Sequence, residues 1–262
     1  MSTPEREVNR VPKRPISKVI GSVFKVHHYT DLINIFQGCD RPVDFFRRYI
    51  GKESQYPCRF KINTPIGLTE FTAFGPHDIL TINEIFFRKD YGDMRADRVV
   101  VDFGSNIGIS ALFFLTRNKD VKVFCFEPLA QNTDKLKENL KGFEGRYQLA
   151  QVAVAQLDGP VDFGFEPTGR YGGVGSSIGK KIEVPGVDSN RVLGEIIAEH
   201  GPVDLLKIDI EMLEHELTAR ITPQLAKDIG RVAIELPFVE NPLPNSHTMR
   251  FRYPITTLEN KS

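Results

Sequence analysis

Val99-Val-Val-Asp-Phe-Gly-Ser-Asn-Ile-Gly-Ile-Ser110 is the stretch of sequence that decides the fold. Residues 99–102 are β-branched and acidic, which predicts a buried strand. Two glycines, Gly104 and Gly108, follow, and the apolar run 111–115 after them predicts a helix. A strand, a glycine-bearing turn and a helix can bring backbone N–H groups close to a cofactor, because glycine has no Cβ. The stretch therefore predicts a cofactor site in an α/β fold.

The chain has 262 residues, enough for one large α/β domain and an extension. Lys plus Arg and Asp plus Glu both number 34, so no net charge attracts nucleic acid or an anionic membrane. We therefore expect no nucleic-acid partner, and a homodimer is left open.

Cysteine use and hydropathy indicate the compartment. The three cysteines show no C-x-x-C spacing, which argues against a disulfide framework or a zinc site and favours a reducing compartment. The first ten residues are polar and lack the apolar core of a signal peptide, and no apolar run reaches the length of a membrane span. The sequence thus predicts a cytoplasmic protein without a membrane span.

Residues 1–90 predict an N-terminal region distinct from the rest of the chain. A polar arm is followed by two short helices between Tyr29 and Ile50 and by a hairpin between Cys58 and Phe74, where apolar and polar residues alternate. We expect this region to be a lid or substrate-facing extension, with a plain structural appendage as the alternative.

Residues 91–236 alternate strand and helix patterns, which predicts a doubly wound, Rossmann-like α/β sheet. The expected strands are 99–102, 121–127, 148–153, 203–209 and 231–235. The expected helices are 109–117, 132–140 and 192–200. Residues 159–187 are expected to insert a hairpin with a mobile loop at 172–177, and residues 237–262 to form a C-terminal tail.

Acidic residues end the first two strands of this core. Asp102 can order the glycine turn and lie near a cofactor amino group, or it can act only as a turn-stabilising acid. Glu127, followed by Pro128, is placed to accept hydrogen bonds from ribose hydroxyls, as acids at this position do in dinucleotide enzymes. The spacing around the turn is D-x-G-x-x-x-G, whereas dinucleotide-binding turns have G-x-G-x-x-G.

A third group of charged residues lies in Asp204-Leu-Leu-Lys-Ile-Asp-Ile-Glu211. Lys207, Asp209 and Glu211 share one face of a strand, because side chains alternate along it. A lysine among apolar residues needs acidic partners, so a structural ion pair is the alternative to a catalytic Lys207. Asp209 ends its strand at the edge of the sheet where α/β folds bind ligands.

Two further predictions concern metal and histidine. The acids, Glu235 included, could hold a divalent metal ion through oxygen ligands, but no feature of the sequence requires one. His215 lies one helical turn after Glu211 and is a candidate general base, with a surface or capping role as the alternative.

At this point the sequence resembles the FkbM-type methyltransferases, a family of class I methyltransferases that use S-adenosylmethionine (SAM). Four motifs carry the resemblance, which spans roughly residues 83–235. Val101-Asp-Phe-Gly-Ser-Asn-Ile-Gly108 resembles the family motif V-D-x-G-A-N-x-G, and Phe126-Glu-Pro128 with Asn132 resembles F-E-P-x-x-x-N. Ala153-Val154 followed by Gly159 resembles the A-V…G motif, and Gly175-Ser-Ser177 resembles the serine-bearing loop after it. Asp204-Leu-Leu-Lys-Ile-Asp-Ile-Glu211 with Glu214 resembles D-L-x-K-I-D-V-E-G-x-E.

The resemblance implies SAM-dependent O-methylation of a sugar, glycan or natural-product hydroxyl, with S-adenosylhomocysteine (SAH) as the second product. It implies a binding site for the methionine portion of SAM at Gly104, Ser105, Asn106 and Gly108. It places Glu127 at the ribose, Asp209 and Glu211 at the reacting centre, and the adenine beside Gln151, Val152 and Ala153.

The sequence departs from the family at three places, one of which is Gln156 in place of a frequent Asp. Met212 stands where the family has Gly, which puts the turn after Glu211 in question. The tail after Glu235 is short for the helix and two antiparallel strands that usually close such a sheet. We therefore expect a single strand at 249–253, or a partner chain, to cover that edge.

The predicted reaction is an in-line displacement in which a substrate hydroxyl attacks the methyl group of SAM. An acid of the Asp209/Glu211 pair assists it as base or orienting group, and positioning supplies much of the rate. One alternative is a nicotinamide-dependent oxidoreductase, against which the missing G-x-G-x-x-G argues. The other is a SAM-binding or scaffold protein without catalysis.

Overall fold

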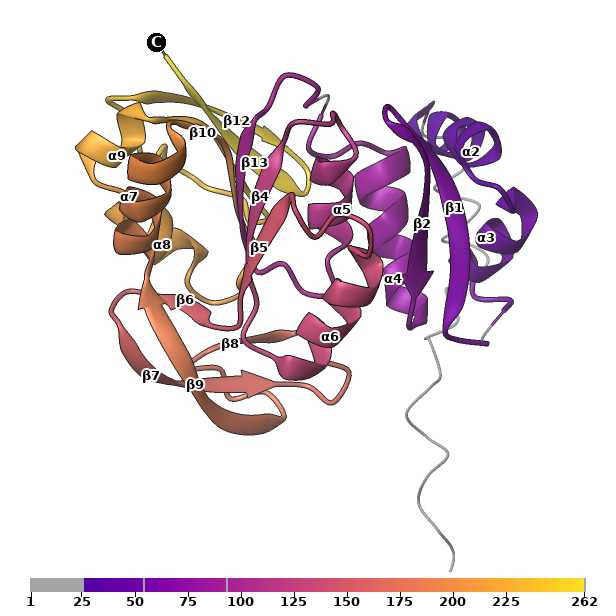
Figure 1. Cartoon of the computed structure of the whole chain (residues 1–262), viewed down its shortest axis with the longest axis horizontal. Coiled ribbons are helices and arrows are strands. Elements are labelled where there is room, and N and C mark those ends of the chain that lie inside the picture. Colours follow the sequence, from indigo (N-terminus) through magenta and orange to yellow (C-terminus); the bar gives the residue numbers. More distant parts are fainter. Residues whose placement is uncertain (1–25, 54, 93, 262) are drawn as a thin grey trace, which may run out of the picture. The chain divides into compact units, whose positions relative to one another are not determined.

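The computed structural model describes residues 26–53, 55–92 and 94–261. The chain divides into two compact units, Met1–Asp90 and Tyr91–Ser262 (Figure 1). The first 25 residues, which include the predicted polar arm, lie outside the described residues. No helix in the described part of the chain is long and apolar enough to cross a membrane.

The first unit packs helices and a β-hairpin around aromatic side chains. The ring of Phe45 packs edge-on against Phe60 and Phe87, with centroids 5.4 and 5.3 Å apart. Both predicted helices and the predicted antiparallel hairpin are present. The elements are α2 (Val26–Gly38), α3 (Pro42–Tyr49), β1 (Cys58–Thr64), β2 (Gly67–Ala73), α4 (Pro76–Ile82) and the π-helical turn η1 (Asn83–Phe87).

The second unit contains a seven-stranded sheet with the order β12-β13-β11-β10-β3-β4-β5. Its parallel strands are β3 (Val99–Phe103), β4 (Lys122–Phe126), β5 (Tyr147–Ala150), β10 (Val203–Ile208) and β11 (Ile229–Ile234). Numbered along the chain, these five lie in the order 3-2-1-4-5 of doubly wound nucleotide-binding folds. The predicted Rossmann-like α/β fold is confirmed.

Helices cover both faces of this sheet. Figure 1 shows α5 (Ile109–Leu115) and α6 (Ala130–Asn139) on one side, and α7 (Ser189–His200), α8 (Glu214–Arg220) and α9 (Pro223–Lys227) on the other. On the second side, Val101 and Leu206 of the sheet belong to the same buried apolar cluster as Leu193 of α7. The three predicted helices are present, with ends shifted by a few residues.

A second, four-stranded sheet begins where β5 ends, so the prediction of one strand over 148–153 is wrong. Residues 151 and 152 lead the chain out of the central sheet, and β6 (Ala153–Ala155) pairs with β9 (Lys180–Asp188). The predicted hairpin in 159–187 is β7 (Gly159–Phe165) against β9. Part of the expected mobile loop is instead a strand, β8 (Gly172–Val174), paired with β7.

The C-terminal residues form two strands, so the expectation of a single strand at 249–253 is wrong. β12 (His247–Arg252) and β13 (Ile255–Asn260) form an antiparallel hairpin, and β13 pairs antiparallel with β11. The buried His247 ring lies 3.0 Å from the carbonyl oxygen of Ile229, to which Asn260 also donates. A tight hairpin needs fewer residues than strands joined by a helix, which is how the short tail extends the sheet.

Candidate functional site

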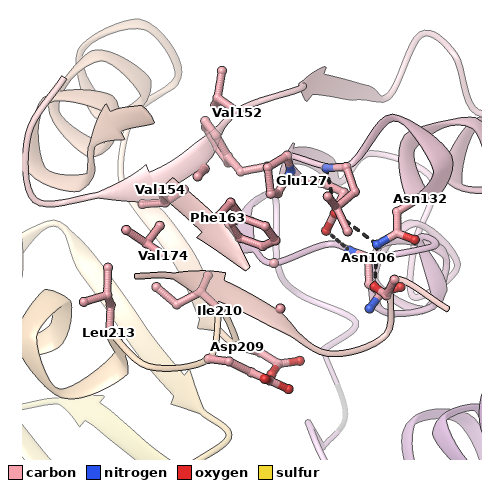
Figure 2. Close-up of a pocket in the computed structure, with 18 of the residues that line it drawn as sticks. Asn106, Glu127, Asn132, Val152, Val154, Phe163, Val174, Asp209, Ile210 and Leu213 are labelled. Atoms are coloured by element: carbon pink, nitrogen blue, oxygen red, sulfur yellow. Dashed lines mark hydrogen bonds between the residues drawn. The ribbon is translucent and has the colours of Figure 1, made fainter. Parts of the chain in front are cut away.

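A pocket opens where β3, β4 and β10 end, and strands of the second sheet form its opposite wall (Figure 2). It contains about 610 Å³ of empty space, part of which is open to solvent. The residues predicted from the sequence that line it are Gly104, Asn106, Glu127, Pro128, Val152, Ala153, Asp209 and Glu211.

The two glycines of the turn are required by packing. Gly104 has a φ of +81°, and a Cβ there would lie 1.8 Å from the carbonyl oxygen of Asp209. Gly108 has a φ of +82°, and a Cβ there would lie 2.9 Å from the side chain of Leu136 on α6. Glycine therefore lets the turn approach the end of β10 and helix α6.

The backbone N–H groups of the turn donate within the protein. Gly104 and Ser105 both donate to the carbonyl oxygen of Phe126, at 3.1 and 3.0 Å. The N–H of Asn106 donates to Oε2 of Glu127 at 3.0 Å. This differs from the expectation that the turn presents these donors to a cofactor: they hold β4 against β3, and Gly104 and the Asn106 side chain remain on the pocket wall.

Lys207 ties the ends of β3 and β10 together from beneath the pocket. Its ammonium group lies 2.9 Å from Asp102, 3.3 Å from Asp209 and 3.0 Å from the carbonyl oxygen of Gly104. The second carboxylate oxygen of Asp102 accepts from Ser110 at 2.6 Å. Burial would lower the pKa of Lys207, but the charges of Asp102 and Asp209 outweigh it and raise this pKa well above its ordinary value. Lys207 therefore forms the ion pair expected as the alternative, and a catalytic role for it stays a prediction.

Glu127 is the best-anchored acid of the pocket. Its buried carboxylate accepts from the N–H of Asn106, the N–H of Leu129 and the side-chain amide of Asn132, at 3.0, 3.1 and 3.0 Å (Figure 2). Burial raises the pKa of Glu127 to about 7, although these donors act in the opposite direction. A carboxylate offers about four acceptor positions, so Glu127 keeps capacity for a ligand hydroxyl.

The loop between β7 and β8 is fastened to the same residues. The Asn132 amide also donates to the carbonyl oxygen of Gly169 at 2.8 Å, and the Asn106 side chain donates to that of Arg170 at 3.2 Å. Gly169 and Arg170 line the pocket. The loop therefore forms part of the pocket wall on the side of Glu127 and the glycine turn.

Asp209 and Glu211 bring two carboxylates to the other side of the pocket. Asp209 is one-third exposed and keeps one oxygen on Lys207. Burial and the charges of Asp209, Glu214 and Glu166 raise the pKa of Glu211 to about 7, while Arg170 lowers it. At neutral pH Glu211 is therefore able to gain or lose a proton.

The turn after β10 forms although Met212 replaces glycine. Glu211 and Met212 both have left-handed backbones, with φ values of +50° and +80°. A Cβ on Gly173 of β8 would lie 2.6 Å from the carbonyl oxygen of Glu211, so β8 packs directly on this turn. Left-handed non-glycine residues are costly and persist where the surroundings hold them, as β8 does here.

The rest of the pocket wall is apolar. Phe163 of β7 and Val174 of β8 face Val152, Ile210 and Leu213 from the central part of the fold (Figure 2). Apolar walls with a few fixed polar groups are typical of small-molecule sites. Such a wall suits the flat, weakly polar faces of a purine.

The other predicted residues lie outside the lining of the pocket: Asp102, Ser105, Gly108, Gln151, Lys207 and His215. Ser105 is buried and its hydroxyl donates to the carbonyl oxygen of Asp102. Gln151 accepts from Thr133 at 3.2 Å. His215 is exposed on α8 with its ring 4.1 Å from that of Phe238, which matches the surface alternative.

Sequence reasoning missed the contribution of the second sheet. Arg170, Phe163 and Val174 line the pocket, but the insertion that carries them gave no sign of where it folds. The sequence identifies Asn132 only as part of a motif, whereas in the structure its side chain anchors Glu127. The glycine pair at 172–173 indicates that this segment packs closely, although it does not show against which part of the chain.

The pocket residues fit a SAM-like ligand in their chemistry. A buried carboxylate suits a ribose, the apolar wall suits an adenine, and the Asp209 and Glu211 carboxylates suit a cationic sulfonium and ammonium. Among the described residues, no group of three His, Cys, Asp or Glu side chains is placed to hold a metal ion.

Comparison with known sequences finds partial matches. No protein-family model matches the chain. The 2-O-methyltransferase NoeI of Sinorhizobium fredii is 33% identical over 69 residues, which cover 26% of this chain and 28% of that protein. The antimetabolite synthetase AmbE of Pseudomonas aeruginosa is 21% identical over 194 residues, 59% of this chain and 9% of that protein. The chain thus spans less than a third of each curated relative.

Comparison with solved structures finds the methyltransferase FkbM of Methylobacillus flagellatus. Its TM-score is 0.45 and its sequence identity 14%, over 70% of this chain and 54% of that one.

Proposed function

We propose that this protein is a SAM-dependent methyltransferase that methylates a hydroxyl group of a sugar, glycan or natural product. The observation that carries the proposal is the Glu127 carboxylate, fixed by three N–H donors beside a D-x-G-x-x-x-G turn in the pocket. Acids after the second strand of such sheets bind ribose hydroxyls. The partial match to a 2-O-methyltransferase supports a hydroxyl acceptor.

In this proposal each part of the pocket holds one part of SAM. Glu127 accepts from the ribose hydroxyls, and Val152, Ala153 and Phe163 flank the adenine. Gly104 and Asn106 border the methionine portion. When bound, SAM supplies a methyl group made electrophilic by its sulfonium.

The acceptor hydroxyl attacks that methyl group, so a carbon–oxygen bond forms as the carbon–sulfur bond breaks and SAH leaves. The hydroxyl proton goes to a carboxylate of the Asp209/Glu211 pair. Glu211 suits this step because its pKa of about 7 lets it take up a proton at neutral pH. Asp209, held by Lys207, orients the hydroxyl.

The wider predictions stay proposals. The balanced charge of 34 basic and 34 acidic residues supports an acceptor other than nucleic acid. The three cysteines without C-x-x-C spacing support a cytoplasmic location. The first unit, Met1–Asp90, is proposed as the source of further acceptor contacts, and a homodimer is left open.

Titration calorimetry with SAM, SAH and NADH tests the cofactor, and transfer of tritiated methyl groups from SAM to a panel of sugars and glycans tests the reaction. We expect SAM and SAH to bind, NADH not to bind, and Asp209→Asn to lower turnover strongly. Binding of NADH alone would favour the oxidoreductase alternative. SAM binding without transfer to any acceptor would favour the scaffold alternative, and near-normal turnover of Asp209→Asn would remove Asp209 from the mechanism.

A further inference from the structure

Acidic side chains outnumber basic ones in the described lining of the pocket. Glu127, Asp209 and Glu211 line it, and Arg170 is the one cationic side chain among its described lining residues. The buried Lys207 has its ammonium group engaged by Asp102, Asp209 and Gly104. An anionic group that enters the pocket would be repelled by the acids, so it needs Arg170.

Arg170 has a fixed backbone and an available side chain. The Asn106 side chain holds its carbonyl oxygen, and Asn132 holds that of the preceding Gly169. The guanidinium lies over the ring of Tyr171, 5.1 Å from the centroid, and no ion pair to it is found in the described part of the chain. Its charge reaches Glu211, whose pKa it lowers.

The backbone of Arg170, held by the Asn106 side chain, lies at the glycine-turn end of the pocket, and Arg170 lines the pocket there. In the proposed function this end receives the methionine portion of SAM, which carries one carboxylate and one ammonium. A guanidinium matches a carboxylate with two parallel hydrogen bonds, which an ammonium side chain cannot do.

We propose that Arg170 binds the α-carboxylate of the cofactor's methionine portion, so that the β7–β8 loop takes part in cofactor recognition. The proposal rests on the function proposed above. The loop and Glu127 share Asn106 and Asn132 as anchors, so the ribose and carboxylate contacts are held by one hydrogen-bonded group. A role for Arg170 in binding an anionic acceptor is the competing outcome.

The experiment compares two ligands that differ only in the carboxylate: SAM and decarboxylated SAM. Calorimetry is carried out on the wild-type chain, Arg170→Gln and Arg170→Lys, with Arg250→Gln on β12 as a matched exposed arginine control. We expect Arg170→Gln to bind SAM about 10- to 100-fold more weakly than wild type, as for loss of a charge-assisted hydrogen bond. Its affinity for decarboxylated SAM should stay within about twofold of wild type, Arg170→Lys should be intermediate for SAM, and Arg250→Gln should match wild type.

The remaining outcomes overturn the inference in distinguishable ways. If Arg170→Gln lowers the affinity for SAM and for decarboxylated SAM equally, Arg170 supports the loop but does not bind the carboxylate. If Arg170→Gln binds SAM as tightly as the wild-type chain, Arg170 does not bind the cofactor, and the result favours a role in binding an anionic acceptor. If the wild-type chain binds neither ligand, the proposed function falls as well, whereas the first two results overturn the role of Arg170 alone.

Discussion

The ammonium group of Lys207 lies 2.9 Å from the carboxylate of Asp102, and both side chains are almost completely buried. This ion pair joins β3 to β10 where the pocket begins. Removing one partner leaves a buried charge without compensation, which typically costs about 3–5 kcal/mol. Lys207→Met should therefore lower the free energy of unfolding by about that amount, measured by urea denaturation.

The control for this prediction is an exposed pair. Lys137 lies 3.8 Å from Asp134 on α6, and both side chains are more than half exposed, so Lys137→Met should change stability by less than about 1 kcal/mol. The double variant Lys207→Met with Asp102→Asn should recover part of the loss, because the unpaired charge is gone. Equal, small effects of Lys207→Met and Lys137→Met would contradict the role given to the buried pair.

Gly104→Ala should destabilise the protein more than an alanine at another left-handed glycine. At Gly104 the new Cβ meets the Asp209 carbonyl oxygen, whereas at Gly142, with a φ of +92°, it meets nothing within 4 Å. Gly142→Ala should cost about 1–2 kcal/mol from the backbone alone. Gly104→Ala should cost about 1–3 kcal/mol more. Thermal unfolding of both variants measures the difference, and equal costs would show that packing against β10 does not require glycine.

Cofactor affinity should depend on pH through Glu127. Its pKa of about 7 lies above the ordinary value of 4.5, and ribose hydroxyls would donate to the ionised form. SAH should therefore bind about tenfold more weakly at pH 6 than at pH 8. In Glu127→Gln the affinity should be lower and nearly independent of pH between these values. A pH-independent affinity of the wild-type chain would separate Glu127 from cofactor binding.

The raised pKa of Glu127 also determines how the stability of the ligand-free protein changes with pH. A carboxyl whose pKa is raised on folding holds its proton more tightly in the native state, so stability falls as pH rises from about 4.5 to about 7. In Glu127→Gln this fall should be smaller. Urea denaturation at pH 5 and pH 7.5 measures it, with the wild-type chain as reference, and an identical pH dependence in both chains would argue against burial of a protonated Glu127.

Turnover should rise through pH 7 if Glu211 takes the proton of the acceptor. Glu211 must be ionised to act as a base, and burial raises its pKa to about 7. In Glu211→Gln the rate should be at least about 100-fold lower, the typical contribution of general base catalysis, and this rise should disappear. If kcat of Glu211→Gln still rises through pH 7, the general base is Asp209 or solvent and not Glu211.

The parallel core and the acids at its strand ends could be predicted from the sequence, because they depend on local patterns. Apolar runs with Asp102, Glu127 and Asp209 at their ends identify strands, and the ends of neighbouring parallel strands meet at one edge. The hydrogen bonds to Glu127 confirm that this acid faces the glycine turn. The ends of the parallel strands differ from the prediction by one residue or two, except at 148–153, where the predicted strand covers parts of two strands in different sheets.

The second sheet and the C-terminal hairpin could not be predicted in the same way, because they depend on long-range pairing. Nothing in residues 151–152 shows that the chain changes sheets there, or that Phe163 and Val174 turn towards β10. The local pattern predicts that Lys207, a lysine among apolar residues, needs acidic partners, but it does not show that Asp102 of the distant strand β3 is one of them.

The central claim is that Glu127 and the glycine turn form a SAM site, and a crystal structure of the chain with SAH tests it most directly. The account predicts SAH in the pocket of Figure 2, with its ribose hydroxyls within hydrogen-bond distance of Glu127 and its adenine beside Val152 and Phe163. SAH bound elsewhere, or a ribose away from Glu127, would contradict it.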